Sequence, residues 1–317
     1  MQKADERGVA LLLALLILTL LVALILEFDA EARREYREAA AFRDNFKASM
    51  LTRAAVQAAR SVLRQDFLRD KQTGEIFDGP TDLWAMPIKN YAIGDGLLSA
   101  QIQDERGKLN LNDLAANAGD EIQKKARIRR VERLFQLLQI NPDLVDALVD
   151  WIDQDDNPQP AGAESLYYQS QKPAYRAANG TLPALGDLSL VKGFTPDIID
   201  KLSRYVTVYP QDGGAPVNIN TADPLVIQAL DPEITQSIAT EIVQGRPFKK
   251  KEDLDRIGSF QSIGAKLRSV GTVYDVKSEY FSARLAITVN ESTKTSLAVL
   301  QRDSNKGESA VKYLRTF

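Results

Sequence analysis

The stretch "RGVALLLALLILTLLVALILEFDAE" (residues 7–31) fixes the architecture that the rest of the chain must join. From Val9 to Leu26 it carries no charged side chain and a single hydroxyl group. A helix over these eighteen residues is roughly 27 Å long at about 1.5 Å per residue, close to the thickness of a bilayer's hydrocarbon core. A secretory signal peptide would end in a small-residue cleavage site, whereas this run passes directly into the acidic segment that begins at Glu27. The stretch is therefore predicted to be a membrane anchor.

The helix of this anchor is predicted to continue well beyond the apolar run. Apolar and aromatic residues recur at helical spacing after it, at Phe28, Ala32, Tyr36, Ala39, Phe42, Phe46 and Met50. This spacing is typical of an amphipathic helix. We expect one transmembrane and stem helix over residues 9–63, a rod of roughly 80 Å. A short charged segment, residues 1–8, precedes it.

The composition of the chain narrows its chemistry. Its 317 residues include no cysteine and no histidine, and the net charge is −3. The absence of both residue types excludes disulfides, thiolate nucleophiles, Ser-His-Asp catalysis and metal ligation by imidazole or thiolate. The acidic balance argues against a nucleic-acid-binding surface, which is usually basic. A non-enzymatic role is favoured, and no catalytic residue is predicted.

Alternating apolar residues predict an antiparallel sheet built from two separated parts of the chain. Residues 90–112 read as strand, turn and strand, and the sequence from Tyr280 onward reads as a three-stranded meander. A connector with Gly and Pro, residues 71–87, follows the stem. We expect residues 64–111 and 271–317 to form one α+β domain, in which the long N-terminal helix packs on the antiparallel sheet.

The region between the two parts of the sheet contains a loose tandem repeat. The segment "KLNLNDLAAN" (residues 108–117) matches "PVNINTADPL" (residues 216–225) in form, and each leads into a helix. Later, "VKGFTPDIIDKLSRYVTVY" and "RIGSFQSIGAKLRSVGTVY" both read as a helical hairpin with a valine-rich exit. We therefore expect two small helical modules of the SAM-like, helix-hairpin-helix-like type, inserted in tandem over residues 112–216 and 217–270.

Carboxylates gather where a helix of the first module is predicted to end, in "DALVDWIDQDDNPQPAGAESLYY" (residues 146–168). Asp153, Asp155 and Asp156 lie at the negative end of the helix macrodipole, which costs about 0.3–1 kcal/mol each without compensation. A cation would remove that cost, and these carboxylates, Glu164 and loop carbonyls offer the oxygen ligands that Ca²⁺ prefers. The alternative is a solvated acidic loop with Asx-turns before Asn157. The spacing is not that of an EF-hand, so both interpretations stay open.

Two other functions are compatible with parts of the sequence. The second module is similar to helix-hairpin-helix modules, some of which bind DNA phosphates through glycine-rich hairpins. Its hairpin "LDPEIT" (residues 230–235) has no glycine and places Asp231 and Glu233 where an anion would bind. A membrane-anchored DNA-binding protein is thus the less favoured alternative. A membrane-tethered hydrolase that uses the acidic cluster is the third hypothesis.

The N-terminus resembles the type III signal of type IV pilins and pseudopilins, in which a charged leader ending in glycine precedes a long apolar helix. The motifs "DERGKLNLN", "LVDWIDQDD", "GAESLYY" and "VNINTA" resemble, in their order, the GspK family of minor pseudopilins of type II secretion systems. The resemblance implies that a prepilin peptidase cuts between Gly8 and Val9, removing the leader 1–8 and leaving a methylated Val9. It also implies a single-pass inner-membrane protein with its C-terminal domain in the periplasm.

The resemblance further implies partners, a role and a cofactor. The expected partners are other minor pseudopilins of a tip complex, the prepilin peptidase, the inner-membrane assembly platform and secreted exoproteins, with no nucleic acid. The expected role is to initiate pseudopilus assembly and to support export of folded proteins across the outer membrane. The family's pair of calcium sites implies that Asp153, Asp155 and Glu164 are ligands. Asp187 stands where the family often has a glutamate and is a further candidate.

One departure from ordinary pilins agrees with a place at the tip. Most pilins carry a glutamate five residues into the mature chain, where this sequence has Leu13. A carboxylate at the centre of a membrane costs roughly 2.5–3.5 kcal/mol and so needs a partner, in pilins the N-terminal amine of the subunit above. A subunit with no neighbour above it does not need this carboxylate.

Overall fold

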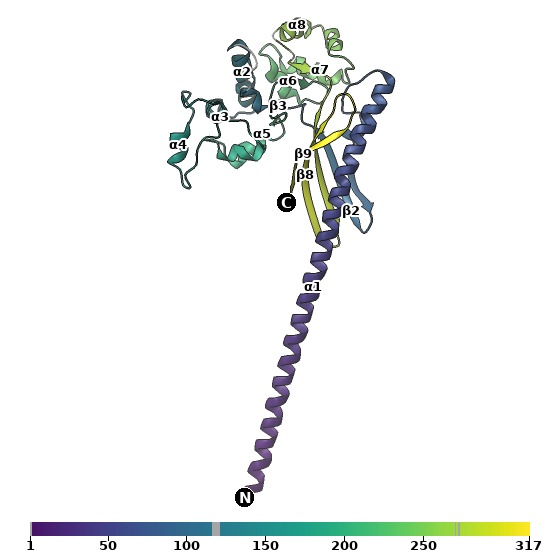
Figure 1. Cartoon of the computed structure of the whole chain (residues 1–317), viewed down its shortest axis with the longest axis vertical. Coiled ribbons are helices and arrows are strands. Elements are labelled where there is room, and N and C mark those ends of the chain that lie inside the picture. Colours follow the sequence, from purple (N-terminus) through teal and green to yellow (C-terminus); the bar gives the residue numbers. More distant parts are fainter. Residues whose placement is uncertain (1, 116–120, 270, 272) are drawn as a thin grey trace.

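The longest element of the chain is the helix α1, Gln2–Thr73. The structure is a computed structural model that describes residues 2–115, 121–269, 271 and 273–317. The N-terminal part of α1 projects as a bare rod away from everything else (Figure 1). The helix ends before Gly74, whose φ of +77° is readily adopted by glycine after a helix.

The expected end of this helix near residue 63 is wrong by ten residues. Residues 64–73 contain neither Gly nor Pro, so nothing in the sequence stops the helix before Gly74. This extension also buries Phe67, which contacts the Arg302 guanidinium and lies against Gly307. At the other end, residues 2–8 of the expected leader continue α1, and Met1 lies outside the described residues.

An antiparallel sheet covers the C-terminal part of α1. Its strand order is β1-β2-β7-β8-β9, so the two strands that precede the insertion lie together at one side of the sheet and the three that follow it lie at the other. The strands are β1 Ile88–Ile93, β2 Gly96–Asp104, β7 Tyr280–Val289, β8 Ser292–Arg302 and β9 Ser309–Thr316. The predicted hairpin and the predicted C-terminal meander are both confirmed by this topology.

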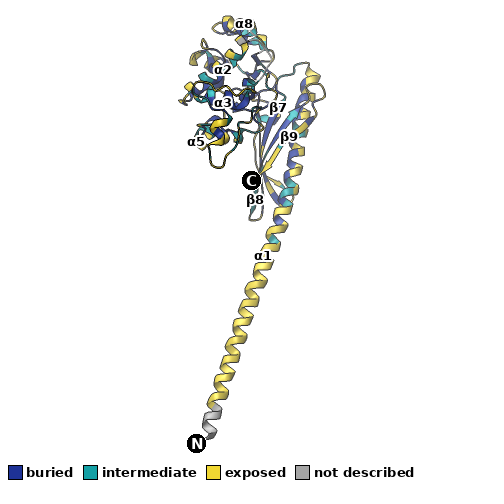
Figure 2. Ribbon diagram, turned by 60° about the vertical axis from the view of Figure 1, so that its left-hand side comes forward, coloured by how far each residue is buried: buried dark blue, intermediate teal, exposed yellow. Residues whose placement is uncertain are grey.

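The core between α1 and the sheet combines small residues of the helix with branched residues of the strands. Ala48, Ala55 and Ala59 let the helix approach closely, and Leu63 fills the space between them and the strands. The opposing residues of the sheet are Leu98, Phe281, Ala283, Leu285, Ile287, Val289, Ala298 and Leu300. In Figure 2, burial on α1 is confined to the part that the sheet covers. The expected α+β class is thereby confirmed.

Two helical modules are inserted between β2 and β7 and lie beside the sheet, at the end of α1 remote from the N-terminus (Figure 1). A 3-10 helix, η1 Leu83–Ala85, precedes the sheet. The first module contains β3 Leu109–Asn110, η2 Leu111–Leu114, α2 Glu121–Leu137, α3 Leu144–Ile152, α4 Ser165–Gln169, η3 Leu185–Leu190, α5 Pro196–Leu202 and β4 Val206–Thr207. The second contains β5 Val217–Asn218, α6 Pro224–Leu230, α7 Gln236–Gln244, η4 Lys251–Arg256, α8 Gln261–Ser269 and β6 Tyr274–Asp275.

Each module is closed by a two-residue parallel pairing between its entry and its exit. β3 pairs with β4 in the first module, and β5 pairs with β6 in the second. The expected module boundaries at residues 112 and 270 are therefore displaced, because bridges this short have no recognisable strand pattern. The first module begins at β3 and the second reaches β6; Val270 itself lies outside the described residues.

The two predicted repeats each contain a buried asparagine that makes the same pair of hydrogen bonds to the backbone. Asn112 accepts a hydrogen bond from Leu182 N at 2.7 Å and donates to Leu182 O at 3.0 Å. Asn220 accepts from Phe248 N and donates to Phe248 O, both at 2.8 Å. Both side chains are fully buried, so each one ties the entry of its module to the segment before η3 or η4.

Candidate functional site

The anchor segment of α1 is exposed along its whole length. An 18-residue window of α1 has a mean hydropathy of 3.3 with none of it buried, so length and composition allow this helix to cross a membrane. Val9 is 58% exposed, and no atom outside the local backbone lies within 4 Å of where a side chain at Gly8 would begin. The predicted cleavage site between Gly8 and Val9 is therefore accessible in the isolated chain.

The acidic loop of the first module brings together three of the predicted ligands. Asp153, Asp155 and Glu164 each place a carboxylate oxygen within 4.8 Å of the other two. Asp153 follows α3 directly, and its backbone N donates to Val149 O at 2.8 Å. Glu164 lies at the N-terminus of α4. The ends of two helices thus point their carboxylates at one place, which is an arrangement suited to a hard cation.

The electrostatics of this group indicate uncompensated negative charge. Both carboxylate oxygens of Glu164 and one oxygen of Asp153 are buried without a hydrogen-bond partner. Burial, and then the charge of Asp150, raises the pKa of Glu164 to about 7. Burial and the neighbouring Asp155 also raise the pKa of Asp153. Because buried charged oxygens are normally paired, these orphaned atoms fit ligation of a cation.

Two further carboxylates shape the loop that carries the group. Asp150 is fully buried, and both of its oxygens accept from Gln159 N at 3.1 Å. Asp146 accepts from Ala161 N at 3.0 Å, and Lys192 Nζ donates to Gly162 O at 2.8 Å. The sequence did not identify Asp150 as the organiser of this loop, because its burial depends on a backbone segment that folds over it.

The two other predicted ligands, Asp156 and Asp187, lie outside the group formed by Asp153, Asp155 and Glu164. Asp156 is exposed and outside the group of three, although its charge adds to the field on Glu164. Asp187 also lies outside the group, and its carboxylate accepts from Ala184 N at 3.0 Å at the start of η3. The hydrogen bond of Asp187 has a local cause, since a carboxylate three residues into a helix readily caps its first turn.

One residue near the group was missed in the sequence. Asn179 donates through its side-chain amide to Asp155 O at 3.4 Å, and its Oδ1 is buried without a partner. Such an oxygen is a neutral ligand of the kind that Ca²⁺ accepts. The sequence offers only the "NG" turn signal at residues 179–180, which says nothing about binding.

The loop geometry is also compatible with one feature of the alternative interpretation. Asp155 Oδ1 accepts from Asn157 N at 2.9 Å, which is the Asx-turn expected for a solvated loop. This bond occupies one lone pair of one oxygen and leaves the others available. No turn satisfies the orphaned oxygens of Glu164, and a merely solvated loop does not account for them.

The hairpin of the second module gives no support to phosphate binding. Between α6 and α7, Asp231 and Glu233 are both paired with Lys266 Nζ, at 3.0 and 2.7 Å. In the basic run that follows, Arg246 donates to Ala222 O and Lys249 pairs with Glu75 at 2.5 Å. The two acidic side chains of the hairpin, both paired with Lys266, occupy the place where a DNA phosphate would bind.

Comparison with known proteins gives consistent matches over the modules and beyond. Two family models, both described as "Type II secretion system (T2SS), protein K", match residues 107–211 and 217–276. The type II secretion system protein K of Pseudomonas aeruginosa is 30% identical over 253 residues, which cover 77% of this chain and 73% of that protein. The corresponding Aeromonas hydrophila protein is 28% identical over 302 residues, 90% of each chain.

A solved structure shows the same fold. A chain in the crystal structure of the GspK-GspI-GspJ complex from the enterotoxigenic Escherichia coli type 2 secretion system superposes with a TM-score of 0.74 at 21% identity. The match covers 87% of this chain and 97% of that chain. The match therefore extends beyond the helical region to most of the molecule.

Proposed function

The chain belongs to the type II secretion system protein K family, and we propose that this minor pseudopilin forms the tip of the pseudopilus and initiates its assembly. The observation that carries the proposal is the position of the two helical modules, beside the sheet at the end of α1 remote from the N-terminus (Figure 1). In a filament whose stem helices pack side by side, the next subunit lies directly over each head. A head enlarged in this way leaves no room for such a subunit.

The stem helix supplies the surface for the neighbouring subunits below. Large apolar side chains remain exposed on α1 beyond the anchor, with Phe28, Tyr36 and Phe42 each about three-quarters exposed (76%, 75% and 75%). Exposed apolar residues along one helix mark a contact with partner helices. The solved relative is named in complex with GspI and GspJ, and we propose that their counterparts are the partners here.

A tip subunit of this kind has a defined place in the cell envelope and needs no catalytic activity. The anchor would hold the protein in the inner membrane, where the prepilin peptidase and the assembly platform act on it, with the sheet and modules in the periplasm. Secreted exoproteins would meet the head, and no catalytic step is assigned to the chain. The tip role is mechanical, since it consists of starting the filament and supporting export of folded proteins.

Processing of the N-terminus tests the proposal. The full-length chain is expressed in membranes with and without a prepilin peptidase, and its intact mass and N-terminal residue are measured. We expect peptidase-dependent loss of residues 1–8 and a methyl group on Val9. The chain without peptidase is the control. An uncut chain in both samples, or salt-dependent binding of the purified protein to DNA, would refute the assignment.

We further propose that Asp153, Asp155 and Glu164 hold a structural Ca²⁺ in the head, with Asn179 and the exposed Asp156 nearby. The support is the convergence of three carboxylates and the orphaned oxygens of Glu164. The bound ion would neutralise the carboxylates at the two helix ends and fix the loop between α3 and α4. Only oxygen ligands are present, which suits Ca²⁺ and not zinc.

Removal of the ligands tests the calcium proposal. The double variant Asp153→Asn/Asp155→Asn keeps the size of both side chains and removes two charges. In a Trp84→Phe background, where Trp151 is the remaining tryptophan and lies two residues before Asp153, we expect Ca²⁺ to quench or shift its fluorescence. We expect no such change when Asp153 and Asp155 are also replaced by asparagine. At a free Ca²⁺ concentration 100-fold above Kd, binding contributes about 2.7 kcal/mol to stability. Asp95→Asn, at an exposed ion pair with Lys47, is the matched control. A wild type indifferent to Ca²⁺ and EDTA would contradict the proposal.

A further inference from the structure

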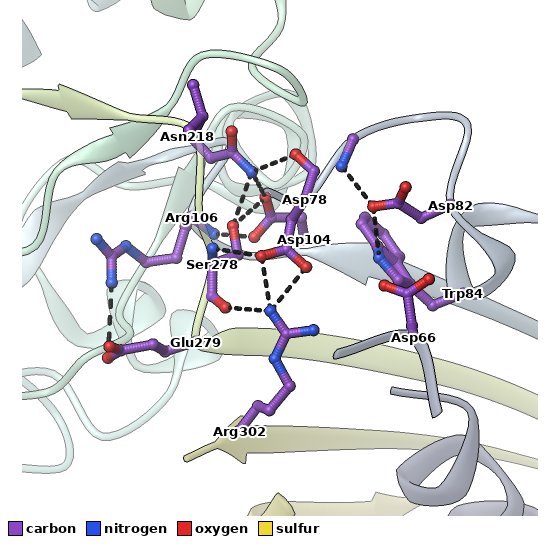
Figure 3. Close-up of polar contacts among 12 residues, drawn as sticks. Asp66, Asp78, Asp82, Trp84, Asp104, Arg106, Asn218, Ser278, Glu279 and Arg302 are labelled. Carbon is purple, nitrogen blue, oxygen red and sulfur yellow. Dashed lines mark hydrogen bonds and ion pairs between the residues drawn. The ribbon is translucent and has the colours of Figure 1, made fainter. Parts of the chain in front are cut away.

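A second group of carboxylates lies at the joint between the stem and the head. Asp66 on α1 and Asp78 and Asp82 in the connector each place one oxygen within 4.8 Å of the others, and all three are buried, at 1%, 0% and 3% exposure (Figure 3). From this geometry we infer that Asp66, Asp78 and Asp82 form a second site for a hard divalent cation. We call this group the joint site and the Asp153, Asp155 and Glu164 group the head site.

One oxygen of the joint site has no partner in the protein. Asp66 Oδ1 accepts from the Arg69 guanidinium at 3.0 Å, whereas Asp66 Oδ2 is buried with no hydrogen bond. In Figure 3 the Asp66 carboxylate faces the space beside Asp82 and Trp84. A carboxylate oxygen that is cut off from water and from every donor is destabilising unless something positive binds it.

The charges around the joint site do not balance. Four buried carboxylates meet there, those of Asp66, Asp70, Asp78 and Asp82, and two guanidinium groups face them. Arg302 binds both oxygens of Asp78 at 2.7 and 2.6 Å, and Arg69 contacts Asp66 and Asp70 from the rim. Carboxylates therefore outnumber guanidinium groups at the joint site, and a bound divalent cation would reduce this excess of negative charge.

Burial opposes ionisation of two carboxyl groups of the joint site. Burial, and then the charge of Asp82, raises the pKa of Asp66 to about 6. Burial raises the pKa of Asp78 to about 7 although Arg302 lowers it.

Hydrogen bonds around the joint site hold the carboxylates in place. Asp82 Oδ2 accepts from Gly79 N at 2.7 Å and from Trp84 Nε1 at 3.2 Å. Asp78 Oδ2 accepts from Ser278 N at 2.8 Å. Such outer contacts orient ligands before a metal binds, and they are the reason why a compact group of like charges persists in the fold.

The position of the joint site gives the cation a distinct role. Asp66 belongs to the last turns of α1, and Arg302 ends β8. On the other side, Asn218 of the second module donates to Asp78 O at 3.0 Å and to Asp104 Oδ2 at 2.8 Å (Figure 3). A cation at this point would connect the stem helix, the sheet and the second module, and would so fix the head on its stem. The inference does not depend on the proposed tip function.

The two tryptophans of the chain allow the two sites to be tested separately. Trp84 donates to Asp82 of the joint site, and Trp151 lies next to the head site. We take the full-length variant Trp151→Phe/Asp153→Asn/Asp155→Asn, in which Trp84 is the remaining tryptophan and the head site is disabled. Ca²⁺ is titrated while Trp84 fluorescence is recorded and bound Ca²⁺ is counted by equilibrium dialysis.

We expect saturable binding of one Ca²⁺ per chain with a change in Trp84 emission. Adding Asp66→Asn should weaken that binding by more than about tenfold. The amide keeps the size of Asp66 and an oxygen for Arg69, and its new NH₂ group can donate to the neighbouring carboxylates, so folding is retained. Asp95→Asn is the control and should leave the affinity unchanged. A folded background variant that shows no saturable Ca²⁺ binding overturns the inference.

A second measurement is independent of this background variant. In an otherwise wild-type chain, Asp66→Asn should bind one Ca²⁺ fewer than the wild type. If Asp66→Asn does not fold, Asp82→Asn replaces it, since its amide oxygen can still accept from Gly79 N and Trp84 Nε1. Equal numbers of bound Ca²⁺ in wild type and variant would overturn the inference.

Discussion

The carboxylates around the loop between α3 and α4 form two sets, those that accept hydrogen bonds from the loop backbone and those whose oxygens have no hydrogen-bond partner. Asp150 and Asp146 are occupied by backbone N–H groups of residues 159–161. Glu164 is also buried, yet neither of its oxygens has a hydrogen-bond partner. Asp150 and Asp146 hold the loop against α3, and the loop in turn holds Glu164 in its buried position. Asp146 and Asp150, which lie outside the group of Asp153, Asp155 and Glu164, therefore preorganise the candidate calcium site.

Gly162 is the residue at which this division can be tested. A Cβ atom there would lie 1.9 Å from Asp150 Oδ2, so Gly162→Ala must displace the Asp150 carboxylate from its bonds with Gln159 N. We expect a loss of about 1–3 kcal/mol in the free energy of unfolding, together with weaker Ca²⁺ binding. Urea denaturation and calcium titration measure the two effects. Gly186→Ala, with open space around its Cβ, should change stability by less than about 0.5 kcal/mol. Equal effects of both substitutions would disprove the steric argument.

Among the elements, α1 combines three tasks in one uninterrupted helix. Its first turns form an apolar anchor, its middle presents exposed aromatic residues, and its last third covers the sheet with Ala48, Ala55, Ala59 and Leu63. No Gly or Pro occurs between Val9 and Thr73, so the rod has no built-in hinge. Force applied to the stem is therefore transmitted directly to the joint with the head.

Because Asn112 and Asn220 each stabilise one module, we expect that replacing one of them destabilises that module alone. Asn112→Ala orphans Leu182 N and Leu182 O, and Asn220→Ala orphans Phe248 N and Phe248 O. Each buried group left unsatisfied costs about 1–3 kcal/mol. Limited proteolysis followed by mass spectrometry should find new cuts within residues 107–211 for the first variant and within 217–276 for the second. Asn305→Ala, in an exposed loop, is the control. Cuts spread over both modules in either variant would argue against independent modules.

At the scale of the whole molecule, the protein is a thin rod that carries a broad head, and the apolar N-terminal part of the rod is consistent with a single-pass membrane anchor. Buried carboxylates of the head and of the joint have raised pKa values, and each lies in a group of like charges. Like charges in the interior destabilise the fold unless protons or cations compensate them. The stability of the molecule as a whole is therefore expected to depend on both pH and Ca²⁺.

The sign of the pH dependence follows from these shifts. The pKa values are about 6 for Asp66 and about 7 for Asp78 and Glu164 in the cation-free fold, above the ordinary 3.8 and 4.5. Between about pH 4 and 7 the folded chain thus holds more protons than the unfolded chain. Its free energy of unfolding should fall as the pH rises, by about 1.4 kcal/mol per pH unit for each extra proton held. Saturating Ca²⁺ should flatten this slope, since bound carboxylates are ionised.

Urea midpoints at pH 5, 6 and 7, each with EDTA and with Ca²⁺, measure this dependence. The gap between the two series should widen toward pH 7. Parallel series would mean that cation binding is not coupled to these carboxylates.

The sequence alone determined the features that depend on neighbouring residues. The run from Val9 to Leu26 identified the anchor, alternation in the two outer segments identified the strands, and the asparagine-containing repeat identified the two modules. The motif order also indicated the family to which the chain belongs. Three of the predicted ligands, Asp153, Asp155 and Glu164, were found together because they flank one loop. Periodicity and short spacing are written into contiguous residues, so they can be read without the fold.

Only the tertiary structure decided what depends on residues that meet from afar. The joint site unites Asp66, Asp78 and Asp82 with Arg302, far along the chain, and none of them belongs to a recognisable motif. The closing bridge between β3 and β4 joins residues about a hundred positions apart, which is why the module boundaries were misplaced. Asp150 and Asp187 each accept a hydrogen bond from a backbone N–H group, and the folded chain determines which N–H group lies within reach. Burial of a charge depends on what packs over it, and that is a property of the folded chain.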